Sequence, residues 1–459
     1  MARGWKVLLV TSVGVFLVAL DVTIVNIAFP AIAADFAGTS RAALSWILSG
    51  YSIAFAASLL TAGRIADRVG RRRSFYTGIA IFSAASALAG LAPNVTLLVA
   101  ARVVQAVGGA LVVPSALALV LPEFPVGRRS AAIGVWGAVG GVAAATGPSL
   151  GSVLVDGVGW RAVFFVNIPA CLIAWFFGRR LLVESRESDR SIPDIAGAVL
   201  GFGGVALLVL ALVQGDAWGW TDARVVASAV GAIVLLPAFV LRSARHPSPV
   251  LDLSLFRLRF FTVANAASFV FAMAFFAMLL HHVLYVTSVW GYSILGAGIA
   301  LTPGPLAAAA VAAPAGRLAD RFGHRALAVP GTIAFALGTW MLAAWTSPEP
   351  AYWRVFFGPQ VLIGTGVGMT IATLVAAANA FLPPERYGMG SAFSQTSRQI
   401  GAAVGVAALV VLLGDAGQDA FERVWVFLGS VSLVAGAVMG ALYRGPVVRP
   451  APVEAGVRA

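Results

Sequence analysis

The stretch GRIADRVGRRRSF at residues 63–75 returns in altered form as GRLADRFGHRALA at residues 316–328. Glycine, arginine, alanine and aspartate recur at matched offsets, and the copies are separated by 316 − 63 = 253 residues. Each copy follows the second of six long apolar segments. The sequence therefore predicts two repeated halves of six membrane-crossing segments each, an arrangement typical of transporters that bind substrate between their halves.

The composition indicates an integral membrane protein. Of the 459 residues, 60% are hydrophobic, 11% are charged and the mean hydropathy is +0.92, whereas about 25% of residues are charged in a soluble domain. The apolar segments suit helices, which need about 20 residues to span a bilayer. They lack the alternating polarity of β-barrel strands. The expected fold class is therefore all-α and integral to the membrane.

Fourteen segments are candidate spans. They lie at roughly 6–33, 45–63, 75–93, 95–120, 131–154, 162–182, 194–213, 223–241, 260–288, 293–315, 326–346, 354–380, 391–413 and 423–443, each near the length that a helix needs. We expect an N-terminal six-helix bundle (residues 1–182), a linker insertion of two extra central helices (183–258), a C-terminal six-helix bundle (259–443) and a disordered cytoplasmic tail (444–459).

The net charge of +12 is explained by topology and does not require a nucleic-acid partner. Most of the 31 basic residues fall in alternate loops that share a side with the N-terminus. Because basic loops stay in the cytoplasm, both termini are expected there. Lysine is almost absent beside arginine, a bias that suggests a bacterial source.

Several chemistries are excluded. The single cysteine, Cys171, cannot form a disulfide within the chain or a cysteine metal site. No phosphate-binding GxxxxGK[ST] loop and no nucleophile–base pair are present. We therefore expect no enzyme activity, no metal and no cofactor.

Four stretches resemble signatures of one family. GRIADRVGRRR resembles the loop signature of the major facilitator superfamily, and LDVTIVNIAFP at 20–30 resembles the first-span signature of its fourteen-span drug:proton antiporter family. RVVQAVGGA at 102–110 resembles the fourth-span signature. GGVAAATGPSLGS at 140–152, with Gly147 and Pro148, resembles the antiporter signature of the fifth span. Three small residues replace the more usual glycines in these stretches: Ala106, Ala143 and Ser152.

The loop motif combines glycines, an acid and arginines. Gly63 and Gly70 permit tight turns and close helix approach. Asp67 can accept hydrogen bonds from arginine or lie at a helix N-terminus. The resemblance implies that Asp67 holds the two halves together on the cytoplasmic side and gates the transition, whereas a purely topological role is the alternative. The same role is expected for Arg68, Arg71 and, in the second copy, Asp320.

Asp21 is a carboxylate inside an apolar segment, where a charge costs at least about 2.5–3.5 kcal/mol. Arg102 is expected at a similar depth and is its natural partner. Burial disfavours the charged form of a carboxylate and a nearby arginine favours it, so protonation can follow conformation. We therefore interpret Asp21 as the exchangeable proton site. A static structural ion pair is the alternative, and direct contact with a cationic substrate is a further role compatible with proton exchange.

Four further polar residues are candidates to line a substrate cavity: Asn26, Gln105, His281 and His282. For Asn26, hydrogen bonding between helices is the alternative. The histidines can titrate near neutral pH and could have an auxiliary proton or substrate role; a hydrogen-bonded packing role or a wetter position nearer the membrane surface is the alternative. Pro30 and the pair Gly147–Pro148 are expected to kink, end or break their helices.

Together these features predict a proton-coupled antiporter that exports hydrophobic or cationic small molecules, such as drugs and antibiotics, by alternating access. Its partners would be the small-molecule substrate, protons and the lipid bilayer of the cell membrane, and the protein would act as a monomer. A proton-coupled importer on the same fold and a membrane sensor without transport are the rival functions.

Overall fold

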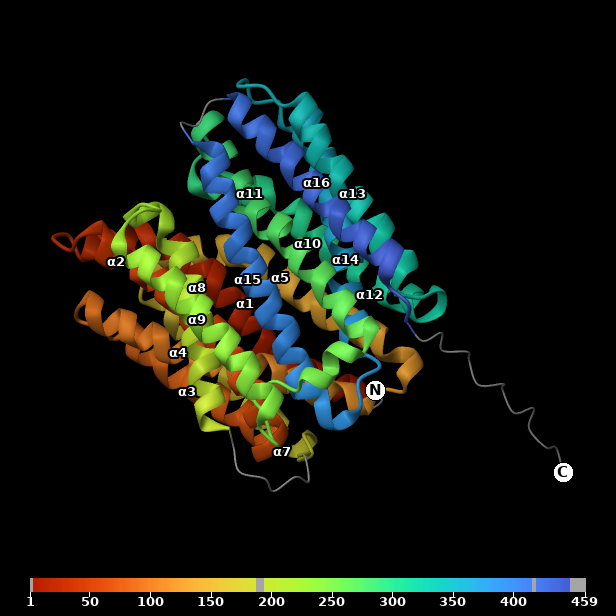
Figure 1. Cartoon of the computed structure of the whole chain (residues 1–459). Helices are drawn as coiled ribbons and strands as arrows, with labels where there is room; N and C mark the ends of the chain where they lie inside the picture. The colour runs from red at the N-terminus through yellow and green to blue at the C-terminus, as the bar shows by residue number, and fades with distance from the viewer. Residues whose placement is uncertain (1–2, 187–193, 415–417, 446–459) are drawn as a thin grey trace.

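The computed structural model describes residues 3–186, 194–414 and 418–445. Within these ranges the chain is helical and contains no strand (Figure 1). The predicted tail from residue 446 onward lies outside the described residues. The helices of the first half are α1 (Arg3–Asp35), α2 (Arg41–Val69), α3 (Arg71–Gly90), α4 (Val95–Val120), α5 (Arg129–Gly157), α6 (Ala162–Phe165) and α7 (Asn167–Leu181).

Two central helices follow, and a second set completes the chain. The central pair is α8 (Ile195–Trp218) and α9 (Ala223–Arg245). The second set is α10 (Arg259–Leu284), α11 (Ile294–Leu301), α12 (Pro303–Phe322), α13 (His324–Trp345), α14 (Phe357–Asn379), α15 (Tyr387–Leu413) and α16 (Gln418–Leu442).

Twelve helical segments of the described chain are long and apolar enough to cross a membrane. The α3 and α5 helices fall outside this set, although they contain 20 and 29 residues. The first begins with three arginines, and the second is rich in glycine, which lowers its hydropathy. The all-helical membrane fold is therefore confirmed, whereas the count of fourteen spans is not.

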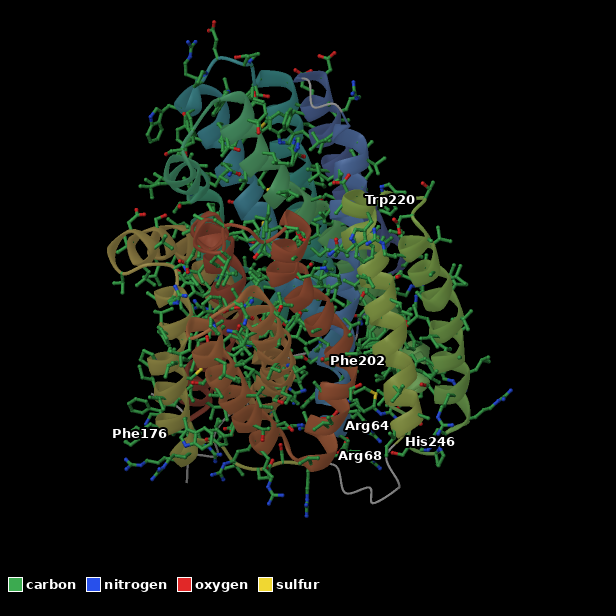
Figure 2. All side chains as sticks on the ribbon, turned by 90° about the vertical axis from the view of Figure 1, so that its left-hand side faces the viewer. Arg64, Arg68, Phe176, Phe202, Trp220 and His246 are labelled. Atoms are coloured by element: carbon green, nitrogen blue, oxygen red, sulfur yellow. The ribbon has the colours of Figure 1, made fainter. Side chains whose placement is uncertain are left out.

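Buried apolar side chains gather separately in the two halves. Two core clusters are built from α1–α7, and a larger one is built chiefly from α10–α16. The α8–α9 pair packs against α2 and α15, which places it beside both halves (Figure 1). Large apolar side chains remain exposed on the outer faces, for example Phe176 on α7 and Phe202 on α8 (Figure 2). A polypeptide exposes such surface to lipid rather than to water.

Asp194 fixes the start of α8 against α9. Its carboxylate accepts a hydrogen bond from the Gly197 N–H at 2.9 Å and one from Arg242 Nε at 2.6 Å. Burial raises the pKa of Asp194, but these two hydrogen bonds and the nearby charges of His246 and Arg242 together hold the pKa below its usual value.

The repeat extends into the helices after the loop motifs. Gly78 and Phe82 of α3 match Gly331 and Phe335 of α13 at the same 253-residue offset, 331 − 78 = 253. A Cβ on Gly108 would lie 2.6 Å from the Phe82 nitrogen, and a Cβ on Gly366 would lie 2.6 Å from the Phe335 nitrogen. Both halves therefore use glycine at this crossing so that two helix backbones can touch.

The expected helix breaks at proline are wrong. Pro30 lies inside α1, which continues to Asp35, and α5 continues through Gly147 and Pro148 to Gly157. Neighbouring helices and local adjustments accommodate proline within membrane helices. The short link expected at residues 290–292 is confirmed, since residues 290–293 are not helical between the π-helical turn at Tyr285–Val289 and α11.

Substitution at the glycine crossing should destabilise the fold. In Gly366→Val the new side chain would overlap the backbone of α13. We expect the thermal unfolding midpoint in detergent to fall, because overpacking lowers the free energy of unfolding by about 1–3 kcal/mol. The matched control is Gly358→Val at the start of the same helix, where a Cβ has no neighbour within 4 Å. Equal losses in both variants would contradict this packing role.

Candidate functional site

Asp21 and Arg102 form the ion pair that their similar depth predicted. Arg102 NH1 contacts Asp21 Oδ2, and the two side chains are 1% and 0% exposed. Asp21 lies on α1 and Arg102 on α4, so the pair joins two helices inside the first half. The positive guanidinium offsets the cost of burying the carboxylate.

Amides surround the other carboxylate oxygen. Gln105 Nε2 donates to Asp21 Oδ1 at 2.8 Å, and Asn167 Nδ2 donates to the same atom at 3.2 Å. Both amides also donate to Ser86 Oγ, at 3.2 and 2.9 Å, and Ser86 donates to the Phe164 carbonyl. Asp21 is therefore held by a buried polar network from α1, α3, α4 and α7.

Arg102 has further acceptors besides Asp21. NH1 donates to Gln105 Oε1 at 2.7 Å, and Nε donates to the Ile47 carbonyl of α2 at 3.3 Å. The guanidinium carbon also lies 4.1 Å from the centre of the Tyr51 ring, a cation–π distance. The Arg102 cation thus has partners besides the Asp21 carboxylate.

The sequence did not single out Asn167 and Ser86. Asn167 lies in a GWRAVFFVNIP stretch, and a lone amide among apolar residues could have marked it. Its proximity to Asp21 arises from the packing of α1 against α7, across 146 residues of chain.

The four predicted cavity residues differ in position. Asn26 is exposed on α1 and has no hydrogen bond to Asp21 among the described contacts. Gln105 is fully buried in the Asp21 network and does not line open space in this structure. The histidines are 0% and 1% exposed.

The two histidines lie within an aromatic cluster of the second half. His281 Nε2 lies 3.1 Å from the Phe421 carbonyl, and its ring centre lies 4.9 Å from that of Trp425. His282 packs against Phe356, with ring centres 5.6 Å apart. The prediction that these residues line a cavity is therefore not met here, because large rings of α16 and the turn before α14 cover them.

The loop motifs make equivalent contacts between the halves. Asp67 on α2 accepts hydrogen bonds from the backbone N–H groups of Gly388 and Met389 at 3.0 and 2.8 Å. These residues form the first turn of α15, whose N–H groups have no partner within the helix. We call this contact the Asp67 cap. Asp67 is fully buried and its negative charge suits the positive helix end.

The second copy makes the same contact in the opposite direction. Asp320 on α12 accepts hydrogen bonds from the N–H groups of Ser130 and Ala131 at 3.1 and 3.0 Å. These residues begin α5, so the Asp320 cap mirrors the Asp67 cap. Each half therefore supplies one carboxylate to a helix N-terminus of the other half.

The two caps differ in one neighbour. Arg71 donates to Asp67 through Nε at 3.1 Å and NH2 at 2.9 Å, and it also donates to the Pro384 carbonyl. The matching position in the second copy is His324, whose Nε2 lies 2.9 Å from Ser130 Oγ. An arginine is thus replaced by a buried histidine that contacts the capped helix.

Glycines let the helices approach at these sites. A Cβ on Gly63 would overlap the Ala392 side chain and lie 2.7 Å from the Gly388 carbonyl oxygen of α15. Gly70 ends α2 with φ of 125°, a backbone region that favours glycine. Arg68 lies at the same end of the molecule as Arg64, near the turn after α2 (Figure 2).

Gly147 connects the fifth-span stretch to the helix of Asp21. A Cβ on Gly147 would overlap the side chain of Thr23, two residues from Asp21. The side chain of Pro148 lies outside the described residues. Close approach of α5 to α1 therefore depends on glycine at this level.

A double-mutant cycle should reveal the buried pair. Arg102→Met leaves the Asp21 carboxylate without its cation, so we expect a loss of stability of about 3–5 kcal/mol. Adding Asp21→Asn removes the orphaned charge and should restore part of this loss. The measurement is thermal unfolding of the wild type, both single variants and the double variant in detergent. Additive losses would contradict direct coupling.

Comparison with known proteins agrees with this architecture. The chain is 36% identical over 428 residues to the tetracenomycin C resistance and export protein of Streptomyces glaucescens, covering 92% of this chain and 78% of the relative. It is 34% identical to the multidrug resistance protein Stp of Mycobacterium tuberculosis, covering 88% and 74%. It is 32% identical to the cephamycin export protein CmcT of Amycolatopsis lactamdurans, covering 95% and 93%.

Solved structures share the fold. The human organic anion transporter MFSD10 has a TM-score of 0.68 at 15% identity, covering 96% of this chain and all of that one. The proton:xylose symporter XylE has a TM-score of 0.67 at 14% identity, covering 96% of each. The family model of the Major Facilitator Superfamily matches residues 11–308 and 264–459. The chain is therefore a multi-pass membrane protein that belongs to the Major Facilitator Superfamily.

Proposed function

We propose that the protein is a proton-coupled antiporter that exports drug-like or antibiotic small molecules across a bacterial cell membrane. Relatives at 32–36% identity are named for antibiotic resistance, export or multidrug resistance. The observation that carries the proton coupling is the buried Asp21–Arg102 pair with its amide network. Among the acids of α1–α16, Asp21 alone lies deep within a helix and away from the caps and the helix ends.

The network suggests how a proton is coupled to movement. When Asp21 takes up a proton, the ion pair is lost and a buried guanidinium remains, which costs several kcal/mol unless it is compensated. Arg102 keeps Gln105 and the Ile47 carbonyl as acceptors. A rearrangement of α1 against α4 would relieve the remaining cost. Protonation therefore favours a conformation different from the one described here.

The finer architecture belongs to the same proposal. We infer fourteen spans, with α3 and α5 added to the twelve apolar segments, and both termini in the cytoplasm. The six-helix bundles would cover residues 1–182 and 259–443, joined by the 183–258 insertion. The Asp67 and Asp320 caps would then lie at the cytoplasmic side and open when the site faces inward. The protein would act as a monomer.

Transport by an Asp21→Asn variant tests the proposal. Asparagine keeps the shape and much of the hydrogen bonding of aspartate, but its side chain does not take up or release a proton as a carboxylate does. We expect wild-type cells to expel members of a panel of cationic, neutral and anionic fluorescent dyes only under a proton gradient. In the variant, this gradient-dependent efflux should fall to the level of cells without the protein. A control is Asp222→Asn in the exposed α8–α9 turn. Unchanged proton-driven efflux in Asp21→Asn would refute Asp21 as the coupling site.

A further inference from the structure

Arg398 is a cation without an acidic partner in the middle of α15. It is the twelfth of the 27 residues of this helix, which runs from Tyr387 to Leu413. Its guanidinium donates to Gln395 Oε1 one turn earlier. Among the described residues no carboxylate forms an ion pair with it. The side chain is half-buried.

The direction of Arg398 follows from its neighbours on α15. Ile400 and Ala403 pack against α2 and α8, and they lie about 140–160° from Arg398 around a helix of 3.6 residues per turn. Ser397 and Gly401 contact α10 and lie about 60–100° to one side. Arg398 therefore lies on the face of α15 that points away from α2 and α8, next to the face that contacts α10.

No acid from the surrounding helices lies at this level. The helices that pack against α15 are α2, α4, α8, α10, α14 and α16. Their acids are Asp67, which caps α15 itself, and three residues at helix ends: Asp216, Asp419 and Glu422. Asp21 is enclosed in the first half and is paired with Arg102.

An unpaired cation at membrane depth is unfavourable. A negative or strongly accepting group from outside the chain would therefore stabilise the Arg398 guanidinium. Gln395 adds a side-chain amide, which offers donors as well as the oxygen that Arg398 occupies. The charge at this level of α15 is thus positive, and the described helices that pack against α15 carry no acid beside it.

We propose that Arg398 and Gln395 bind the anionic oxygen group of the exported compound, such as a carboxylate, enolate or phenolate on an apolar scaffold. This inference rests on the proposed export function and names the substrate class of that site. It reverses the expectation of cationic substrates. An arginine fork recognises such planar oxygen groups by two parallel hydrogen bonds.

Two dyes with one xanthene scaffold test the charge preference. Fluorescein carries a carboxylate and a phenolate, and rhodamine 123 is an ester with a cationic ring system. Binding of each dye to purified protein in lipid nanodiscs would be measured by fluorescence anisotropy, and efflux from cells would be measured in parallel. The variants are Arg398→Gln, Arg398→Lys and Gln395→Leu, with Arg354→Gln as the control that removes an exposed arginine elsewhere.

We expect fluorescein to bind the wild type more tightly than rhodamine 123. Arg398→Gln should raise the Kd of fluorescein about tenfold or more, the loss typical of a charge-assisted hydrogen bond. Arg398→Lys should recover part of the affinity. Gln395→Leu should also weaken fluorescein binding, and this variant tests the site if the Arg398 variants do not fold. Rhodamine 123 and the control should be unaffected.

Three results would overturn the anion site. They are a wild type that prefers rhodamine 123, an unchanged fluorescein affinity in Arg398→Gln, and equal losses for both dyes. The proposed function is judged separately by gradient-dependent efflux. Export of rhodamine 123 alone would refute the anion site and leave export standing. Fluorescein binding that depends on Arg398 without efflux of any dye would support the anion site and refute export.

Discussion

Two carboxylates join the halves of the molecule, and each does so through backbone N–H groups of the opposite half. Asp67 caps α15 and Asp320 caps α5. A helix N-terminus carries four unpaired N–H groups and a partial positive charge. Each cap therefore gives the buried carboxylate hydrogen-bond donors and gives the N–H groups of the helix end an acceptor. The glycines at positions 63 and 316 let the helices approach closely beside these two contacts.

The same constraint, that a charge at membrane depth needs a partner, organises the rest of the structure. Asp21 is neutralised by Arg102 and enclosed by amides. Asp67 has Arg71 as well as its helix end. Arg398 departs from this rule in the described chain, with only the neutral Gln395 beside it. The anion site proposed above would supply the missing negative partner when substrate binds.

The sequence predicted the features that depend on local pattern or on the repeat. The 253-residue offset identified both acid caps as equivalent, and depth along two helices identified the Asp21–Arg102 pair. It could not predict contacts that arise from packing of distant helices, such as Asn167 on Asp21. It also misjudged His281 and His282, because residues more than 130 positions later bury them. Proline positions suggested helix ends or breaks, but α1 and α5 continue through them.

The most direct test of this account is a distance measurement across the two caps. Spin labels on cysteines introduced at the exposed positions Arg73 and Glu385 would report the separation, because the native Cys171 is buried. We predict that Asp67→Ala and Asp320→Ala each raise the ratio of long-distance to short-distance populations by a factor of about 5–30. This is the change expected when a variant loses about one or two kcal/mol of free energy that favours the joined halves. Distances that stay at the wild-type value in both variants would contradict the claim that the two caps hold the halves together.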